Sequence, residues 1–394
     1  MAVTKMSDEA GIEPPSSDPP VNAFDALLPK DTRSHVIKAH LDRFVIGQES
    51  AKTELSTLLS MHVLFASQPG RMFQTPNALL VGPTGVGKTH SIRTAAEHLS
   101  LPFVIADTTK LLPSGAHREN GEHVEQMLLD LIEAARAIVS KTDRETQREA
   151  ARILRSDYGY GGRSDAQDLL ALALAERGVI FLDEFDKLTT GKADLNIAGW
   201  NRTVQRRLLK LVEGAVMPID GPSDISAINS AGILFIGGGA FDGLDSQIIR
   251  ARRPPEISRL PSNSDRVLSA DIVAYGFIPE LVARFPVLIK YGSLTKSDLW
   301  KILSNPTVDP LQPFIYYFEK NGKRLVVTDE ARDAIAAQAY VLDMGVRGIL
   351  QVIFPPIAKV AHSFFQQDSE SVYELTADAV HQWPGMEGGA AAGS

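Results

Sequence analysis

The chain has 394 residues, of which 44% are hydrophobic and 22% are charged, a composition typical of a folded globular protein long enough for two domains. Its formal net charge of −8 means that the chain as a whole does not attract nucleic acid. It contains no cysteine, which excludes disulfides, cysteine zinc sites and a thiol nucleophile.

The N-terminal segment, residues 1–28, is polar and rich in proline, so we expect it to be a disordered arm. Acidic residues and prolines stand where a secretory signal needs an apolar core, and no segment reaches the length of a membrane span. A cytoplasmic location without membrane contact is the resulting expectation. Helices are predicted to begin at Pro29 and at Glu49, and the short segment Val45 to Gln48 separates them.

A glycine-rich turn follows a buried strand that we predict at residues 78–81. It reads G-P-T-G-V-G-K-T-H and fits the phosphate-loop pattern, in which glycines let backbone N–H groups cradle phosphate oxygens. Lys88 is expected to reach the β- and γ-phosphates, and the Thr89 hydroxyl to coordinate Mg²⁺. A structural turn without a ligand is the alternative interpretation. The expected nucleotide-binding residues of this segment are Gly82, Pro83, Thr84, Gly85, Val86, Gly87, Lys88, Thr89 and His90.

Buried strands alternate with helices as far as about residue 290. This alternation is typical of the α/β class and predicts a parallel five-stranded sheet flanked by helices. Residues 140–176 are expected to form a short insertion that contains a charged helix and a glycine-rich loop. Loops are expected at residues 107–123 and 242–270. The predicted strands are residues 78–81, 103–106, 179–182, 233–236 and 287–289.

The third of these strands ends in the pair Asp183-Glu184. A carboxylate beside a phosphate loop is suited to hold Mg²⁺, directly or through water, so Asp183 is the expected partner of Thr89. Glu184 can then orient and deprotonate the attacking water, which predicts hydrolysis as well as binding of the nucleotide. An apolar strand that ends in Asp-Glu is common, and the interpretation depends on the phosphate loop upstream.

Beyond residue 290 the pattern becomes mainly helical. We therefore expect a large domain of residues 29–290 and a small, mainly helical lid domain of residues 291–384. The last segment, residues 385–394, is rich in glycine and alanine and is expected to be disordered. The elements predicted for the lid are helices at 295–304, 309–320, 329–342 and 346–364 and strands at 325–327 and 372–375.

Together these segments resemble the AAA+ ATPases of the ClpX/HslU type, the unfoldase rings of bacterial ATP-dependent proteases. The resemblance runs from about Val45 to about Leu375. It implies the AAA+ phosphate-loop NTPase fold, ATP and Mg²⁺ as cofactors, a homo-oligomeric ring that is expected to be a hexamer, and protein substrates. The matching segments, in order, are VIGQ, GPTGVGKT, VIFLDEFDKL, VQRRLLKLVEG, GILFIGGGAF, GFIPELVARFPV and GVRGIL.

The resemblance also implies roles for individual residues. Ile46 would lie against the adenine, and the Asp-Glu pair at the end of the third strand would be the Walker B pair. Arg284 would be the arginine finger, which reaches the γ-phosphate of a neighbouring subunit, and Glu280 lies in the helix that ends at this finger. Arg347 would be the sensor-2 arginine, which contacts the nucleotide from the small domain. Outside this motif context, both arginines would be interpreted as ordinary surface residues.

Several segments depart from the pattern of that family, which marks the chain as a divergent member. The zinc-binding N-terminal domain of ClpX is expected to be absent. Residues 115–121 lack the aromatic residue of the substrate-gripping pore loop, and residues 242–275 lack the Ile-Gly-Phe loop that docks a peptidase. A peptidase partner therefore stays open. The histidines show no metal-binding spacing, so the Mg²⁺ that accompanies ATP is the expected metal.

Two functions of different classes remain open. The leading interpretation is an ATP-dependent protein unfoldase or remodelling chaperone, which could serve as the ATPase subunit of a protease. The alternative is a nucleotide-gated scaffold or assembly factor that neither threads substrates nor docks a peptidase. Nucleic-acid binding is not expected, because its support in the sequence is limited to one cluster of arginines, Arg250 to Arg253.

Overall fold

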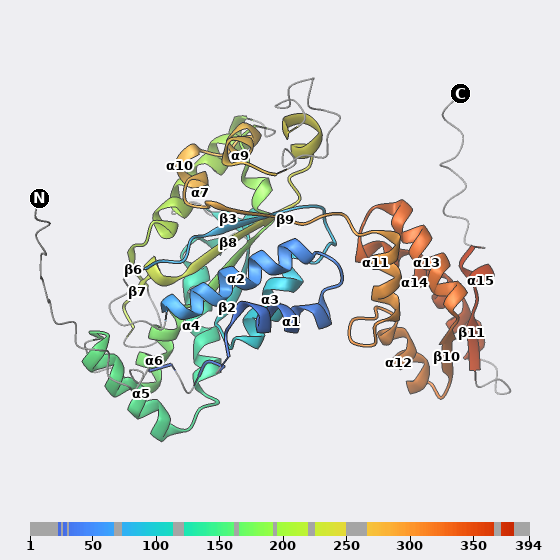
Figure 1. Cartoon of the computed structure of the whole chain (residues 1–394), viewed down its shortest axis with the longest axis horizontal. Coiled ribbons are helices and arrows are strands. Elements are labelled where there is room, and N and C mark those ends of the chain that lie inside the picture. The colour runs from blue at the N-terminus through green and yellow to red at the C-terminus, as the bar shows by residue number, and fades with distance from the viewer. Residues whose placement is uncertain are drawn as a thin grey trace, which may run out of the picture.

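The computed structural model places the chain in two lobes that a short linker joins (Figure 1). The large lobe holds a five-stranded sheet, and the small lobe is mainly helical. The described residues are 23–24, 27–29, 31–66, 73–112, 122–160, 165–191, 195–219, 225–249, 266–365 and 372–381. Outside these ranges lie several segments discussed above: residues 1–22 of the N-terminal arm, the loop at 115–121, the arginine cluster at 250–253 and the tail at 385–394.

The sheet of the large lobe is parallel throughout and has the strand order β2-β5-β8-β1-β9. Successive residues of strand β1, which lies between β8 and β9, join different apolar clusters: Leu79 belongs to one and Leu80 to the other. Alternation of this kind places one cluster on each face of the sheet. The expected parallel five-stranded sheet is therefore confirmed. Its strands are β1 Ala78–Val81, β2 Phe103–Asp107, β5 Val179–Asp183, β8 Leu234–Gly239 and β9 Val287–Lys290.

Helices cover both faces of this sheet (Figure 1). Helices α1 to α3 pack on the face that holds Leu80, and their apolar cluster continues into the small lobe through Leu299 and Ile335. The lobes therefore share one continuous core. No helix in the described part of the chain is long and apolar enough to cross a membrane. The helices of the large lobe are α1 Ser34–Phe44, α2 Glu49–Ala66, α3 Lys88–His98, α4 Gln126–Val139, α5 Arg144–Asp157, α6 Ala166–Ala175, α7 Leu195–Val212, α9 Ser269–Tyr275 and α10 Pro279–Val282.

Short elements occupy segments that we expected to be loops. A parallel pair of short strands lies within residues 107–123, and a π-helical turn lies within residues 242–270. Strand β8 also extends to Gly239, beyond its predicted end, because its glycines pair with β1 although glycine has a low β-propensity. Together with those that lie elsewhere, the short elements of the large lobe are η1 Thr108–Lys110, β3 Leu111–Leu112, β4 Glu122–His123, η2 Phe185–Leu188, β6 Val216–Pro218, β7 Ala227–Asn229, η3 Ser230–Gly232 and η4 Leu244–Ile249.

The small lobe contains the predicted helices and a two-stranded parallel sheet. A short last helix, α15, was not predicted. Apolar residues of the long helices face inward and form the lobe's part of the shared core. The elements are α11 Lys296–Ser304, α12 Gln312–Lys320, β10 Arg324–Val327, α13 Asp329–Leu342, α14 Val346–Phe364, β11 Val372–Leu375 and α15 Ala377–His381.

The end of the N-terminal segment that we expected to be disordered packs against the large lobe. The Phe24 side chain is 0% exposed. The guanidinium of Arg177 lies 4.5 Å from the centroid of the Phe24 ring, and the Tyr158 ring meets that ring edge-on at 5.9 Å. Tyr158 closes helix α5 of the 140–176 insertion, so this cation–π cluster joins the insertion to the N-terminal segment.

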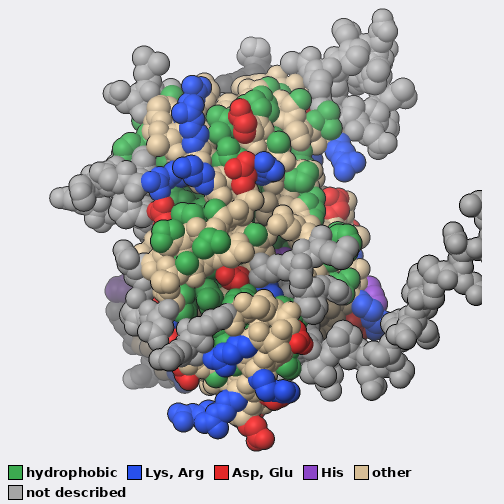
Figure 2. Space-filling view, turned by 90° about the vertical axis from the view of Figure 1, so that its left-hand side faces the viewer, with side chains coloured by type: hydrophobic (Ala, Val, Ile, Leu, Met, Phe, Trp, Pro, Cys, Tyr) green, Lys and Arg blue, Asp and Glu red, His purple; other side chains and the backbone are tan. Residues whose placement is uncertain are grey.

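The end of the large lobe that is remote from the small lobe has mixed charge. Figure 2 shows Lys and Arg side chains interspersed with Asp and Glu on this face. Two ion pairs of the large lobe illustrate the mixture: Arg152 with Glu149 at 2.6 Å and Arg284 with Glu213 at 2.7 Å. The described part of this face therefore does not form the continuous basic stripe that is typical of nucleic-acid binding.

Candidate nucleotide-binding site

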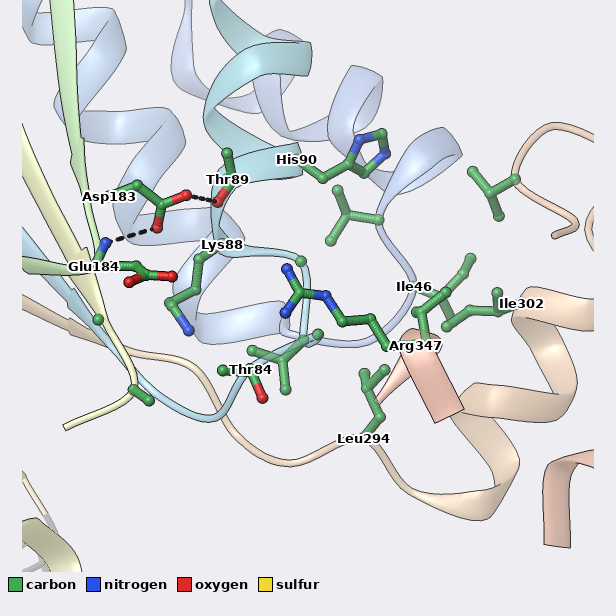
Figure 3. A pocket seen from close by; sticks show the side chains of 18 of the residues that line it. Ile46, Thr84, Lys88, Thr89, His90, Asp183, Glu184, Leu294, Ile302 and Arg347 are labelled. Carbon is green, nitrogen blue, oxygen red and sulfur yellow. Dashed lines mark hydrogen bonds between the residues drawn. The ribbon is translucent and has the colours of Figure 1, made fainter. Parts of the chain in front are cut away.

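A pocket of about 540 Å³ lies between the two lobes. Its walls come from the loop between α1 and α2, the phosphate loop with the start of α3, the ends of β5 and β8, and the small lobe (Figure 3). Charged side chains line one end of the pocket and apolar side chains line the other. The pocket therefore suits a ligand that has an anionic part and a flat apolar part.

The phosphate loop joins β1 to α3, and its glycines are required by its shape. Gly85 and Gly87 have φ angles of +74° and +100°, in the left-handed region that favours glycine. At Gly82, a Cβ atom would lie 2.3 Å from the carbonyl oxygen of Tyr291. Helix α3 begins at Lys88, and its first N–H groups have no partner within the helix. A helix start of this kind binds anions.

The Lys88 ammonium is held by the phosphate loop itself. Its Nζ atom donates hydrogen bonds to the carbonyl oxygens of Gly82 at 2.6 Å and Pro83 at 2.7 Å. The side chain is 8% exposed, and this burial lowers the pKa of Lys88 to about 8, against the opposing influence of Asp183 and Asp186. An incoming phosphate would offer the ammonium stronger acceptors than the two carbonyls.

The Thr89 hydroxyl and the Asp183 carboxylate lie side by side at the charged end of the pocket (Figure 3). Thr89 Oγ1 donates to Asp183 Oδ2 at 3.4 Å, and the other oxygen of Asp183 accepts the N–H of Glu184 at 2.9 Å. Such a pair of oxygen donors fits Mg²⁺, which takes one or two protein ligands and completes its shell with phosphates and water. The described residues contain no larger cluster of His, Asp and Glu that could hold a metal alone.

Glu184 occupies an unusual backbone conformation at the mouth of the pocket. Its φ of +53° and ψ of +33° place it in the left-handed region, which is unfavourable for any residue with a Cβ atom. Two groups hold it there: Thr108 Oγ1 donates to the carbonyl oxygen of Glu184 at 2.8 Å, and Asp183 accepts its N–H. The Glu184 side chain stays exposed, so its carboxylate can meet a water molecule. Backbone strain of this kind is concentrated at functional sites.

The apolar end of the pocket lies between the α1–α2 loop and the small lobe. Ile46, Leu294 and Ile302 all line this end (Figure 3). His90 closes the side of this end, with its Nε2 atom 3.2 Å from the carbonyl oxygen of Phe44. Apolar walls of this kind are suited to a flat base. Sequence reasoning named Ile46, His90 and, from the small lobe, Arg347. It missed the apolar residues of the small lobe, because they give the same signal as an ordinary core.

Arg347 enters the pocket from the first turn of α14 and points toward Lys88 (Figure 3). Next to it, the N–H of Val346 donates to the carbonyl oxygen of Gly85 at 3.1 Å. The start of α14 is therefore attached directly to the phosphate loop.

Most of the predicted nucleotide-binding residues line this one pocket. The exceptions in the phosphate loop are Gly82 and Pro83, which contribute the carbonyl groups that hold Lys88. The predicted residues that line the pocket are Ile46, Thr84, Gly85, Val86, Gly87, Lys88, Thr89, His90, Asp183, Glu184 and Arg347.

Two predicted site residues, Glu280 and Arg284, do not line the pocket. Both side chains are exposed, and Glu280 lies in the first turn of α10. The guanidinium of Arg284 donates to Glu213 at 2.7 Å, and the carbonyl oxygen of Arg284 accepts a hydrogen bond from Asn77 at 3.1 Å. Neither residue can therefore contact a ligand in the pocket of its own chain as the lobes are arranged here.

A further carboxylate, which sequence reasoning missed, lines the pocket at the end of β8. Asp186 belongs to η2, is 2% exposed, and has its carboxylate close to Gly239. A Cβ atom at Gly239 would lie 2.5 Å from Asp186 Oδ1. The glycine at the end of this strand therefore leaves room for a buried acid. The signal was present in the sequence, since Asp186 belongs to the same VIFLDEFDKL segment as Asp183.

Comparison with known proteins identifies the family. Residues 74–288 match the family described as AAA domain (Cdc48 subfamily). The chain is 33% identical over 341 residues to the ATP-dependent Clp protease ATP-binding subunit ClpX of Borrelia duttonii (strain Ly), covering 80% of this chain and 71% of that protein. It is 33% identical over 342 residues to the same subunit of Treponema denticola, covering 80% and 74%, and 31% identical over 343 residues to ClpX 2 of Wolinella succinogenes, covering 82% and 77%. The chain therefore belongs to the ClpX-type AAA+ ATPases, and it is an ATPase.

Proposed function

We propose that this ATPase holds ATP with Mg²⁺ in the pocket between its lobes and hydrolyses it within a homo-oligomeric ring, expected to be a hexamer, to remodel protein substrates. One observation carries the proposal. A single pocket collects a buried lysine, a hydroxyl–carboxylate pair, a second carboxylate and an arginine from the small lobe. The two domains, residues 29–290 and 291–384, would change their relative angle as the nucleotide changes.

The charged end of the pocket supports a hydrolysis mechanism in which each group has one task. The Lys88 ammonium binds oxygens of the β- and γ-phosphates, and the N–H groups at the start of α3 bind the others. Thr89 and Asp183 would hold Mg²⁺, which when bound neutralises charge on the phosphates. Glu184 orients the attacking water and accepts its proton. Arg347 adds positive charge from the small lobe.

The position of Arg284 supports assembly into a ring. Its guanidinium is exposed and lies outside the pocket of its own chain, so we propose that it acts on a nucleotide in a neighbouring copy. A cation supplied by another subunit can stabilise the charge on the transferred phosphoryl group. Glu280, which lies on α10 just before Arg284 in the chain, would then lie at the same subunit boundary. In this arrangement every complete site needs two copies of the chain.

Protein substrates and a peptidase partner are supported by the names of the relatives, which are ATP-binding subunits of ATP-dependent Clp proteases. The alternative, a nucleotide-gated scaffold or assembly factor, is favoured by residues 115–121, whose sequence lacks an aromatic side chain. Unfolding of a tagged fluorescent protein separates the two. A remodelling enzyme removes the fluorescence only with ATP, whereas a scaffold hydrolyses ATP and leaves the fluorescence intact.

The site assignment is tested by ATP hydrolysis and nucleotide binding measured on the same proteins. Glu184→Gln should retain binding of ATP and lose hydrolysis by at least about 100-fold, because it removes the proton acceptor without changing the shape of the side chain. Lys88→Ala should lose binding of the nucleotide. Wild-type rates of hydrolysis in Glu184→Gln would refute the assignment.

A further inference from the structure

The side chain of Gln48, beside the apolar end of the pocket, is bonded to the linker between the lobes. Its Nε2 atom donates to the carbonyl oxygen of Gly292 at 2.7 Å, and its Oε1 atom accepts the N–H of Gly292 at 3.0 Å. These hydrogen bonds join residues that are 244 positions apart in the chain. The amide thus engages both backbone groups of one residue, as a neighbouring strand would.

The linker, residues 291–295, is fixed at both of its ends. Tyr291 is 0% exposed, and its N–H donates to the carbonyl oxygen of β1 residue Val81 at 2.8 Å, which fastens the start of the linker to the sheet. At the other end, Thr295 and Asp298 form a capping box that fixes the first turn of α11. The linker runs between β9 and α11 in Figure 1.

Gly292 lies between these two fixed points, where the chain has room to turn. A Cβ atom added at Gly292 would meet no other atom within 4 Å. Packing therefore does not hold this residue, and the Gln48 amide does. The residue before Gln48 lies close to the small lobe as well, because a Cβ atom added at Gly47 would lie 3.4 Å from the carboxyl group of Asp298. Gln48 is thus bonded to the linker, and Gly47 lies beside the first helix of the small lobe.

The same two residues continue the wall of the base site. Val45 and Ile46 line the pocket, and the carbonyl oxygen of Val45 accepts a hydrogen bond from the buried Nζ of Lys52 at 3.1 Å. Gly47 and Gln48 follow at once with φ angles of +72° and +58°. The left-handed conformation is unfavourable for Gln48, so its contacts must hold it there. A base that contacts Ile46 therefore acts on a short segment that hydrogen bonds hold on both sides, from Lys52 to Val45 and between Gln48 and Gly292.

We propose that Gln48 is a positioning residue that transmits occupancy of the base site to Gly292 and so sets the angle between the lobes. This inference rests on the proposed nucleotide site. In this proposal two separate sets of hydrogen bonds connect the small lobe to the nucleotide site. The bond from Val346 to Gly85 couples the small lobe to the phosphate loop, and the bonds between Gln48 and Gly292 couple it to the base site.

The experiment measures the distance between the lobes in the full-length, assembled protein. Because the chain has no cysteine, spin labels can be placed specifically with Glu97→Cys on α3 and Glu319→Cys on α12, both at exposed positions. Labelled chains are diluted with unlabelled chains, so that double electron–electron resonance reports the distance between the two spin labels of one subunit. Distances are recorded without nucleotide, with ADP and with a non-hydrolysable ATP analogue, and affinity is measured with fluorescent ADP.

Three variants test whether the hydrogen bonds from Gln48 to Gly292 cause the effect. Gln48→Ala removes both hydrogen bonds to Gly292. Gln48→Glu keeps the size of the side chain and the acceptor, but loses the donor and places a carboxylate against the carbonyl oxygen. Gly292→Ala is the matched control, since it keeps both backbone groups and adds a Cβ atom in open space.

The wild type and Gly292→Ala are expected to give narrow distances that shift with nucleotide. In Gln48→Ala the distribution should broaden, the shift should be largely lost, and ADP affinity should fall about tenfold. Gln48→Glu should lie between these results. The inference is overturned if Gln48→Ala shifts as the wild type does. If the wild type binds no ADP, the proposed function fails first and this inference falls with it.

Discussion

The Nζ atom of Lys88 lies 2.6 Å from the carbonyl oxygen of Gly82, at the opposite end of the same phosphate loop. This bond keeps a buried cation satisfied before any phosphate arrives. Burial nevertheless favours the neutral amine and lowers the pKa of Lys88 to about 8. The charge on which phosphate binding depends is therefore lost within an accessible range of pH.

We predict that affinity for ADP falls as the pH rises above 8. Phosphate oxygens favour the protonated amine, so the pKa of Lys88 is higher in the complex than in the free protein. Affinity is then complete below the pKa of the free protein and falls by up to about tenfold per pH unit above it, until the pH reaches the pKa of the complex. Calorimetric titration with ADP between about pH 7 and 9.5 measures this slope.

Lys88→Arg provides the control for this titration, because a guanidinium stays charged over the whole range. Whatever its absolute affinity, this variant should show little change of affinity with pH. The same slope in both proteins would show that another group is responsible. Above about pH 8 the phosphates of ADP are already fully ionised, so the ligand does not contribute the slope there.

A second prediction concerns the contact between Gly239 and Asp186. Gly239→Ala should destabilise the protein by about 1–3 kcal/mol, because the new Cβ atom would lie 2.5 Å from Asp186 Oδ1 and 2.9 Å from the Asp186 backbone nitrogen. The backbone cannot rotate out of the way as a long side chain can. Chemical denaturation measures the loss in the free energy of unfolding.

Gly199→Ala is the matched control for that substitution. Gly199 lies within helix α7, and an added Cβ atom there meets nothing within 4 Å. Because alanine favours a helix over glycine, this variant should be stabilised by up to about 1 kcal/mol. If both variants changed stability equally, the close packing between β8 and Asp186 would not be the cause.

The backbone of Glu184 leads to a third prediction, in which stability and activity change in opposite directions. Glu184→Gly should raise the free energy of unfolding by about 0.5–1 kcal/mol, since glycine adopts the left-handed conformation without strain but loses more chain entropy on folding. Hydrolysis should be abolished. Glu184→Ala also abolishes hydrolysis but keeps the strain, so its stability should match that of the wild type. Thermal unfolding of the three proteins tests this order.

Local patterns in the sequence were enough to predict the sheet and most of the charged end of the pocket, although the buried Asp186 was missed. The phosphate loop fixes Lys88 and Thr89 by a short motif, and strand β5 delivers Asp183 and Glu184 because parallel strands end at the same edge. Even helix α14 was predicted across its two internal prolines, Pro355 and Pro356, since its apolar periodicity continues past them.

The base end of the pocket could not be predicted in the same way. Leu294 and Ile302 are apolar residues of the small lobe, and no pattern separates a residue that lines a pocket from one that fills a core. The bonds from Gln48 to Gly292 join distant parts of the chain and leave no periodic signal. Burial of Phe24 was missed for a related reason, because its partner Arg177 belongs to another segment.

The last prediction tests whether the arginine of one chain completes the site of another. Arg284 is half exposed and pairs with Glu213, a surface contact worth less than about 1 kcal/mol, so Arg284→Ala should fold normally. It should nevertheless lose hydrolysis by at least about 100-fold, because an arginine supplied between subunits stabilises the transferred phosphoryl group. Glu213→Gln breaks the same ion pair but keeps the arginine, and should hydrolyse ATP at the wild-type rate.

Mixing two inactive proteins then separates action within a chain from action between chains. Glu184→Gln keeps Arg284, and Arg284→Ala keeps Glu184, so a boundary between the two variants can assemble one intact site. Random mixing in equal amounts would make roughly a quarter of the sites complete, and that share of wild-type hydrolysis should return. If Arg284 acted on its own chain, no boundary would hold both groups in one site, and the mixture would remain as inactive as its components.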